Sequence, residues 1–263
     1  MRRPGAPVTA CGLGEKHRVT VWGMGDEGGF DPTFDFRTEA LPGEDPDSTS
    51  RTLRAYHKLL WSKPLPSGDM FELEIITTYR PVLHHVSSRG EFFLTSDSTV
   101  QTWTRPGAWP QMQAVIAQVP EQEKETFRTI AHQIGGKVVF PVDSKPTINQ
   151  ARGMNSAIAD RFDLTLECIR LHYLGETSPL AEVLIRYRDF FALFEDFNGY
   201  TDFFLLQDLI SEDSSMVKFF MPFADFGTSP LPPTAEMYQA YRQNAIRFVE
   251  ARNRRMAEYV VRL

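Results

Sequence analysis

One stretch of the chain, residues 148–210, is apolar enough to form a core and yet is crossed by many charged side chains. An unpaired charge loses several kcal/mol when it leaves water, so charged groups are rarely buried without partners. The stretch therefore predicts either a structural network of ion pairs or a lined functional site. Its charged and titratable side chains include Arg152, Asp160, Arg161, Asp163, Glu167, Arg170 and His172.

The second half of the chain predicts helices. Apolar residues recur at the spacing of one helix face after Asn155, where we expect a helix to begin. Ten of the twenty phenylalanines lie between Phe190 and Phe226, so we expect the core to be built largely there. Thr234 predicts the start of a last helix that runs to about Tyr259. The side chains that we expect to be buried are Phe162, Leu166, Ile169, Phe190, Phe191, Phe194, Phe203 and Phe204.

The first half predicts short β-strands, mainly between residues 70 and 142. The segment MFELEI alternates apolar and acidic residues, and PVLHHV and EFFLTS have the length and composition of strands. Gly90 lies between the last two segments and predicts a hairpin turn. Before these strands, Ser50 predicts the cap of a helix through TLRAYHKLLW. We therefore expect an α+β fold, in which short, largely antiparallel strands of the first half pack on an α-helical second half.

The domain organisation is predicted to be simple. Residues 1–29 read as a loose N-terminal leader, and residues 30–263 as a single α+β domain. No linker in the sequence is long enough to separate two cores. Within the domain we expect a β-containing part over about residues 30–147 and an α-rich part over about residues 148–263.

Composition excludes several classes of protein. A net charge of −6 argues against a surface coated in phosphate contacts, although a local basic groove is compatible with it. The two cysteines, Cys11 and Cys168, are far apart, and low cysteine usage suits a reducing cytosol. No apolar run reaches the roughly 18 residues that a membrane span needs, and the first residues lack the apolar region of a secretory signal. We expect a cytoplasmic protein with no part in a membrane. Two cysteines exclude a thiolate zinc site; we predict no metal site, and no cofactor is specified.

The first candidate site lies on the predicted central helix. Asp160, Asp163, Glu167 and Arg170 follow at spacings of three, four and three, which places them on one helix face. Asp163 and Glu167 are like charges one turn apart, so their negative charge must be compensated. The candidates are Arg170, Arg152 from just upstream, another cation or solvent. If the face lines a cleft, the carboxylates are catalytic candidates and the two arginines are substrate-binding candidates. If it does not, the same residues form an ion-paired face against a neighbouring helix, with Arg161, Arg186 and Arg188 as candidate partners.

The second candidate site lies in the segment YRPVLHHVSSRGEFFLTSDS. A neutral imidazole is a common general base, which makes His84 and His85 catalytic candidates, and Arg80 suits an anionic substrate such as a phosphate. Adjacent residues of a strand face opposite ways, so the two histidines cannot line one pocket unless a bulge intervenes. Otherwise one histidine points inward to Asp97 or a backbone carbonyl, and the other meets water.

A third feature is the excess of arginine on the last predicted helix, where Glu250 and Glu258 offset part of the positive charge. Cations near a helix C-terminus interact favourably with the helix dipole, so this excess can reflect capping and solubility alone. It can also form a docking strip for RNA, DNA or an acidic protein partner. The arginines concerned are Arg242, Arg247, Arg252, Arg254, Arg255 and Arg262.

Two functions are therefore open. One is an enzyme that acts on a nucleotide or nucleic acid in a cleft lined by Arg80, a histidine and the Asp163/Glu167 face. The alternative is a non-catalytic binding or regulatory protein, in which the charged helix is an ion network and the basic last helix docks a partner. A shared cleft would favour the enzyme, whereas carboxylates paired by arginines with no cavity beside them would favour the binding protein. The oligomeric state is not specified by either.

Several segments together resemble a family of bacterial proteins of about this length that has no assigned function. They are FDFRTEALPGEDPDSTSRTLRAYHKLLWSKPLPSG, GEFFLTSDS, ARGMNSAIADRFDLTLECIRLHYLGETSPL, FFLLQDLISEDSSMVKFFMPF and IRFVEARNRR. The resemblance extends over about residues 30–256. It implies a bacterial, cytosolic origin and supplies no catalytic residue, so the candidate sites rest on residue chemistry alone.

Overall fold

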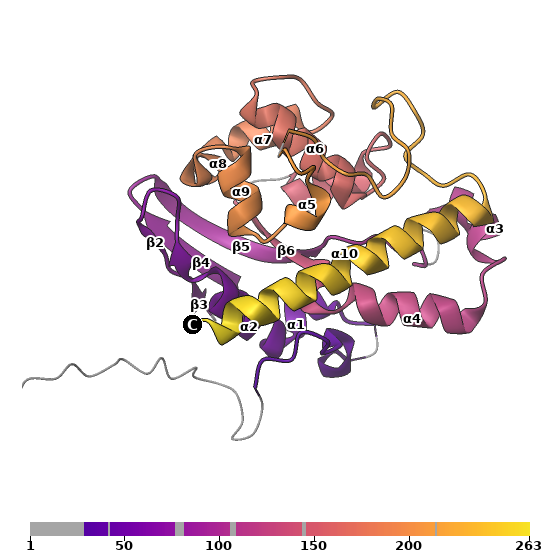
Figure 1. Ribbon diagram of the computed structural model, residues 1–263, viewed down its shortest axis with the longest axis horizontal. Coiled ribbons are helices and arrows are strands. Elements are labelled where there is room, and N and C mark those ends of the chain that lie inside the picture. Colours follow the sequence, from indigo (N-terminus) through magenta and orange to yellow (C-terminus); the bar gives the residue numbers. More distant parts are fainter. Residues whose placement is uncertain (1–28, 42, 77–81, 106–108, 144–145, 214) are drawn as a thin grey trace, which may run out of the picture.

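Within the described part of the chain, the strands all lie between Lys63 and Pro141, and helices fill most of the sequence after Ile148 (Figure 1). The structure is a computed structural model that describes residues 29–41, 43–76, 82–105, 109–143, 146–213 and 215–263. This arrangement confirms the predicted α+β fold. The proposed leader falls on residues outside the described part, apart from Gly29, and the domain boundaries stay a prediction.

Two antiparallel sheets form the β-part. The larger has the order β3-β4-β5-β6, and the smaller pairs β1 with β2. Gly90 takes a positive φ of 145° in the tight connection between β4 and β5, where Ser87 pairs with Gly90, as the hairpin prediction requires. The strands are β1 (Lys63–Pro64), β2 (Met70–Phe71), β3 (Glu74–Ile76), β4 (Val82–Ser87), β5 (Gly90–Ser98) and β6 (Lys137–Pro141).

Helices gather on both sides of β5 and β6: in the view of Figure 1, α5 to α9 lie above these strands and α2, α4 and α10 below. The α-helices are α1 (Pro46–Thr49), α2 (Arg51–Trp61), α3 (Gln113–Ile116), α4 (Glu121–Ala131), α5 (Ile148–Met154), α6 (Phe162–Tyr173), α7 (Ala181–Arg186), α8 (Arg188–Phe191), α9 (Phe197–Phe203) and α10 (Ala235–Val261). Short 3-10 helices are η1 (Phe36–Glu39), η2 (Pro110–Met112), η3 (Ile134–Gly136), η4 (Ala192–Phe194) and η5 (Gln207–Leu209).

Two predicted helix starts are confirmed by their capping bonds. The Ser50 side chain accepts from the backbone N–H of Leu53 at the start of α2, and Thr234 accepts from Met237 at the start of α10. Each hydroxyl satisfies one of the backbone donors that a helix leaves free at its first turn. These caps fix where α2 and α10 begin.

The expected helix from Asn155 is wrong in its first turn, because α6 begins only at Phe162. Ala159 and Asp160 have φ of 47° and 61°, in the left-handed region that a right-handed helix excludes. Trp103 Nε1 donates to the Ala159 carbonyl at 3.2 Å, which holds this turn outside the helix. Asp160 therefore does not share the helix face that carries Asp163.

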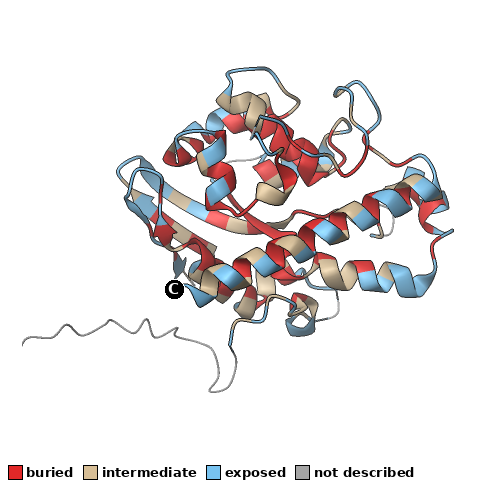
Figure 2. Ribbon diagram, viewed as in Figure 1, coloured by how far each residue is buried: buried red, intermediate tan, exposed pale blue. Residues whose placement is uncertain are grey.

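Buried side chains from both halves of the chain form one hydrophobic cluster (Figure 2). All eight side chains that we expected to be buried are in it, and none is more than 4% exposed. Phe194 is fully buried, with the centroids of the Phe190 and Phe204 rings at 5.3 and 5.2 Å. The concentration of phenylalanine thus identifies a large part of the core.

Candidate functional site

Asp163 on α6 is held in a buried ion pair with Arg161. Arg161 Nε and Nη2 donate to the two carboxylate oxygens at 3.1 and 2.5 Å, and both side chains are at most 1% exposed. Asp163 Oδ2 also accepts from the backbone N–H of Phe220 at 2.9 Å, and Arg161 Nη1 donates to the Pro230 carbonyl. The pair therefore fastens the start of α6 to the segment that precedes α10.

Glu167 is paired by Arg170, one turn further along α6. Arg170 Nε and Nη2 each donate to one oxygen of the Glu167 carboxylate at 2.8 Å. The side chains are 12% and 22% exposed, so this pair lies at the edge of the core. Each of the two candidate carboxylates on α6 is thus held by an arginine of its own.

Arg152 is fully buried, but its acidic partners are not the α6 carboxylates. Arg152 Nη1 lies 2.6 Å from Asp97 Oδ2, and Nε lies 3.3 Å from Asp160 Oδ1. Its Nη1 and Nη2 also donate to the carbonyls of Ser98 and Asp160, and Nε donates to Thr165 Oγ1 on α6. Burial raises the pKa of both Asp97 and Asp160, although Arg152 opposes the shift. This arrangement ties α5 to β5 and to the left-handed turn.

The two candidate histidines face opposite sides of β4. His85 is 1% exposed, lies against Phe71 at a ring separation of 3.9 Å, and shares a 2.9 Å hydrogen bond between Nδ1 and the Glu72 carbonyl. Burial lowers the pKa of His85. His84 Nε2 lies 2.7 Å from Glu91 Oε1 on the other face. The structure therefore does not bring the histidines together, and Arg80 lies outside the described residues.

A buried histidine that the sequence did not point to, His57, forms a chain with Trp61 and Ser96. Trp61 Nε1 donates to His57 Nδ1 at 3.0 Å, so the proton of the neutral imidazole lies on Nε2, 3.0 Å from Ser96 Oγ. His57 thus donates to the serine, which is the reverse of what a base that activates a nucleophile must do. Burial lowers the pKa of His57 to about 3. The chain is a structural link between α2 and β5.

Three arginines of α10 bind groups that lie outside this helix. Arg242 pairs with Glu123, and Arg255 pairs with Asp208. Arg252 is fully buried and donates to the carbonyls of Phe204, Leu205, Gly135 and Lys137. Three further arginines of this segment are exposed, namely Arg247, Arg254 and Arg262.

Lys63, at the start of β1, is the feature that stands apart from this pattern of paired charges. Its Nζ lies 5.0, 4.7 and 4.8 Å from the ring centroids of Trp61, Phe203 and Tyr259. The residue is 8% exposed. Within the described residues its amine makes no ion pair and no hydrogen bond, so aromatic rings are its neighbours.

Lys63 lines a hollow of about 460 Å3 that is walled mainly by apolar side chains. Burial and the positive charge of Arg252 lower the pKa of Lys63 to about 7, against the opposing charge of Asp202. Near neutral pH the charged and uncharged forms of the Lys63 amine are therefore present in similar amounts. The other residues that line the hollow are Pro64, Leu65, Pro66, Gly199, Asp202, Phe203 and Tyr259.

The aromatic rings around the Lys63 amine come from the ends of three helices, of which α9 and α10 line the hollow. Trp61 ends α2, Phe203 ends α9, and Tyr259 lies in the last turn of α10. Gly199 brings α9 close to the β1–β2 turn, because a Cβ at this position would lie 3.0 Å from Cγ of Pro66. Sequence reasoning missed the site because Lys63 lies in a Pro- and Gly-rich turn segment, where a lysine is ordinarily exposed.

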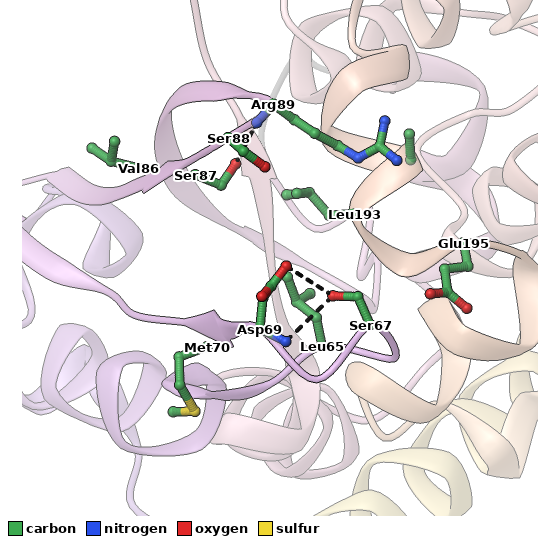
Figure 3. A pocket seen from close by; sticks show the side chains of 11 residues that line it. Leu65, Ser67, Asp69, Met70, Val86, Ser87, Ser88, Arg89, Leu193 and Glu195 are labelled. Carbon is green, nitrogen blue, oxygen red and sulfur yellow. Dashed lines mark hydrogen bonds between the residues drawn. The ribbon is translucent and has the colours of Figure 1, made fainter.

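A second hollow of about 410 Å3 lies between the β1–β2 turn, the β4–β5 hairpin and residues 192–195 (Figure 3). Leu65 lines both hollows, and Arg89 and Glu195 contribute opposite charges to the second one. Ser67 and Asp69 are hydrogen-bonded to each other in its wall. None of the sequence-predicted site residues that the structure describes lines either hollow.

The described residues contain neither a cluster of metal ligands nor a membrane-spanning helix. No group of three or more histidine, cysteine, aspartate or glutamate side chains is placed there to hold a metal ion. No helix in the same residues has the length and apolar character that a membrane crossing needs.

The model of a family of unknown function, DUF6994, matches residues 30–256 of the chain. No curated protein and no solved structure matches it. The predicted resemblance to a family without assigned function is thereby confirmed over nearly the whole described chain.

Proposed function

We propose that this chain, which belongs to the family of unknown function DUF6994, is an enzyme that binds a small organic molecule in the Lys63 hollow and reacts with it through the Lys63 amine. The observation that carries the proposal is an amine that lines the hollow with aromatic rings around its nitrogen and that has, among the described residues, no carboxylate paired with it. A lysine kept only for solubility or surface pairing has no reason to lie there.

The chemistry follows from the state of the amine. Only the uncharged form has the lone pair that attacks a substrate or takes up its proton, and a lysine is activated when it is desolvated beside another cation. Lys63 meets both conditions, because it is buried and Arg252 lies close enough to lower its pKa. A strongly perturbed amine in a cavity is a common property of reactive sites.

The shape of the hollow suits a small ligand. Its volume of about 460 Å3 falls within the range of roughly 300–1,000 Å3 that is usual for small-molecule sites. Pro64, Leu65, Pro66 and Phe203 offer apolar walls, and Asp202 adds a carboxylate to the lining. Mainly apolar walls with few polar groups are typical of sites that orient a ligand by a small number of contacts.

The two functions expected from the sequence remain predictions, and the contacts of their candidate residues support them less than the Lys63 hollow supports amine chemistry. A nucleotide or nucleic-acid substrate at the Asp163/Glu167 face would have to displace arginines that already hold both carboxylates. Those pairs favour an ion network on α6. An acidic partner at α10 would be limited mainly to Arg247, Arg254 and Arg262, which are exposed. We retain a bacterial, cytoplasmic setting as a proposal that accompanies the family resemblance.

The proposal is tested by arylating the folded protein with fluorodinitrobenzene at pH 7 and mapping the modified lysines by mass spectrometry. At this pH the uncharged fraction of an amine with a pKa of about 7 exceeds that of an ordinary lysine roughly a thousandfold. Even with restricted access, Lys63 should react at least about tenfold faster than Lys58, an exposed lysine on α2. Equal rates, or slower modification of Lys63, would contradict the proposal.

A further inference from the structure

Resting on the proposed function, we infer that the substrate is a small, uncharged aldehyde or ketone that Lys63 binds covalently as an imine. Two features of the hollow carry this inference. One is a primary amine held in an apolar cavity, and the other is the carboxylate of Asp202 in the lining of the same cavity.

The reaction balances without another reactant. The lone pair of Lys63 Nζ attacks the carbonyl carbon, and a C–N bond forms as the π bond between carbon and oxygen breaks. The oxygen takes up a proton and the nitrogen loses one, which gives a neutral carbinolamine. A second proton then reaches the hydroxyl group, water leaves, and the nitrogen loses its last proton to give the neutral imine. One carbonyl compound and one amine yield one imine and one water.

Asp202 is the group that the structure assigns to the proton transfers. Gln207 Nε2 donates to Asp202 Oδ1 at 2.9 Å, and no hydrogen bond to Oδ2 is made within the described residues. The residue is exposed and lines the hollow, so its free oxygen can exchange protons with bound molecules and solvent. A carboxylate positioned to give and take protons is what carbinolamine formation and dehydration both need.

The charges of the hollow select against an anionic carbonyl compound such as a keto acid. Among the described residues of the lining, Asp202 is the only acidic one, and Lys63, the only basic one, is consumed by the reaction. Arg252 lies nearby but its guanidinium is fully buried and donates to four backbone carbonyls. A substrate carboxylate would therefore meet a like charge with no cation free to pair with it.

The experiment traps the imine by reduction. The full chain is incubated with butanal and cyanoborohydride at pH 7, and the butylated sites are located and timed by peptide mass spectrometry. Butylation at Lys63 should be at least about tenfold faster than at Lys58, the exposed lysine of α2. The Lys63→Met variant should lose this rapid site, and Lys58→Arg should retain it.

Two comparisons distinguish the parts of the inference. Pyruvate in place of butanal should modify Lys63 more slowly, and a preference for pyruvate would overturn the uncharged substrate class. Asp202→Asn removes a negative charge that raises the pKa of Lys63, so by that effect alone it should speed the reaction. Slowing of roughly tenfold would support the role in proton transfer, whereas an unchanged or faster rate would overturn that role.

Comparison of the arylation and trapping rates tests imine formation separately from the reactivity of the amine. Rapid arylation of Lys63 by fluorodinitrobenzene together with no rapid trapping by butanal or pyruvate would overturn the imine and leave the proposed amine chemistry standing. Slow arylation and slow trapping together would overturn both.

Discussion

Lys63 Nζ lies 4.7 Å from the centroid of the Phe203 ring, and the two side chains line the same hollow. A cation over an aromatic face is stabilised by about 0.5–2 kcal/mol, which offsets only part of the cost of burying an ammonium group. The folded protein therefore holds Lys63 where its charged and uncharged forms have similar free energies near neutral pH.

The first prediction is that Lys63→Met stabilises the protein at low pH. The pKa of Lys63 is about 7 in the folded protein and 10.5 ordinarily, so the unfolded chain binds this proton more tightly. The cost to stability is fully present below pH 7 and disappears as the pH rises from 7 towards 10.5. Methionine has no proton to lose and packs well against aromatic rings. Urea unfolding at pH 6 should show the variant to be more stable, by at most about 5 kcal/mol.

Lys58→Met is the matched control, because Lys58 is exposed on α2 and its replacement should change stability by less than about 0.5 kcal/mol. The advantage of Lys63→Met over the wild type should shrink between pH 7 and pH 10. An advantage that does not change with pH would show that Lys63 titrates as an ordinary lysine.

The second prediction separates the two ion pairs of α6. Asp163→Asn leaves Arg161 buried without its carboxylate, and removal of one partner of a buried pair typically costs about 3–5 kcal/mol. Glu167→Gln breaks a pair at the edge of the core and should cost about 1 kcal/mol or less. Thermal melts of the two variants beside the wild type measure the difference.

A wild-type melting temperature for Asp163→Asn would mean that Arg161 does not depend on this carboxylate. A shift of the wild-type melt by nucleotides or short RNAs would restore the α6 face as a candidate site, even if the stability ranking is as predicted.

The third prediction concerns the aromatic core. Phe194 is fully buried between Phe190, Phe203 and Phe204. Phe194→Ala should therefore lower the free energy of unfolding by about 3–5 kcal/mol, since it removes a large side chain and leaves a cavity. Denaturant titration checks this value, and a loss below about 1 kcal/mol would show that the core is centred elsewhere.

The fourth prediction is that His57 contributes to acid unfolding. Its pKa is about 3 in the folded protein and 6.5 ordinarily, so the unfolded state takes up the proton first as the pH falls. Stability should decline from pH 6.5 to pH 3, with a slope of up to about 1.4 kcal/mol per pH unit from this group. Glutamine can accept from Trp61 and donate to Ser96 without titrating, so His57→Gln should flatten the decline. An equal slope in both proteins would remove His57 from the acid response.

The fold could be predicted from the sequence wherever one local signal had a single meaning. The hydroxyl caps Ser50 and Thr234 begin α2 and α10, and Gly90 lies at a tight hairpin. The start of α6 could not be predicted, because the apolar spacing continues through Ala159 and Asp160. Their left-handed turn depends on two hydrogen bonds from outside it. Trp103 lies 56 residues before Ala159, and Arg152 lies 8 residues before Asp160.

The candidate sites were harder to predict, since pairing depends on tertiary structure. The spacing of Asp163, Glu167 and Arg170 is real, but Asp163 takes Arg161 as its partner and not the arginine that shares its helix face. The sequence around Lys63 does not predict that this lysine is buried. The hollow forms only in the folded chain, where Phe203 and Tyr259 of two helices distant in sequence lie near the Lys63 amine. Burial of a lysine in a turn segment becomes visible only in the folded chain.

The most direct test of an uncharged Lys63 amine is its titration in the folded protein. Lysine labelled with 13C at Cε is introduced, the Lys63 signal is assigned by its loss in Lys63→Met, and its chemical shift is followed by NMR from pH 5 to pH 11. We predict a midpoint near pH 7 for Lys63, well below the value of 10.5 that is ordinary for lysine. A Lys63 midpoint above pH 10 would contradict the account, because the amine would then be almost fully protonated at neutral pH.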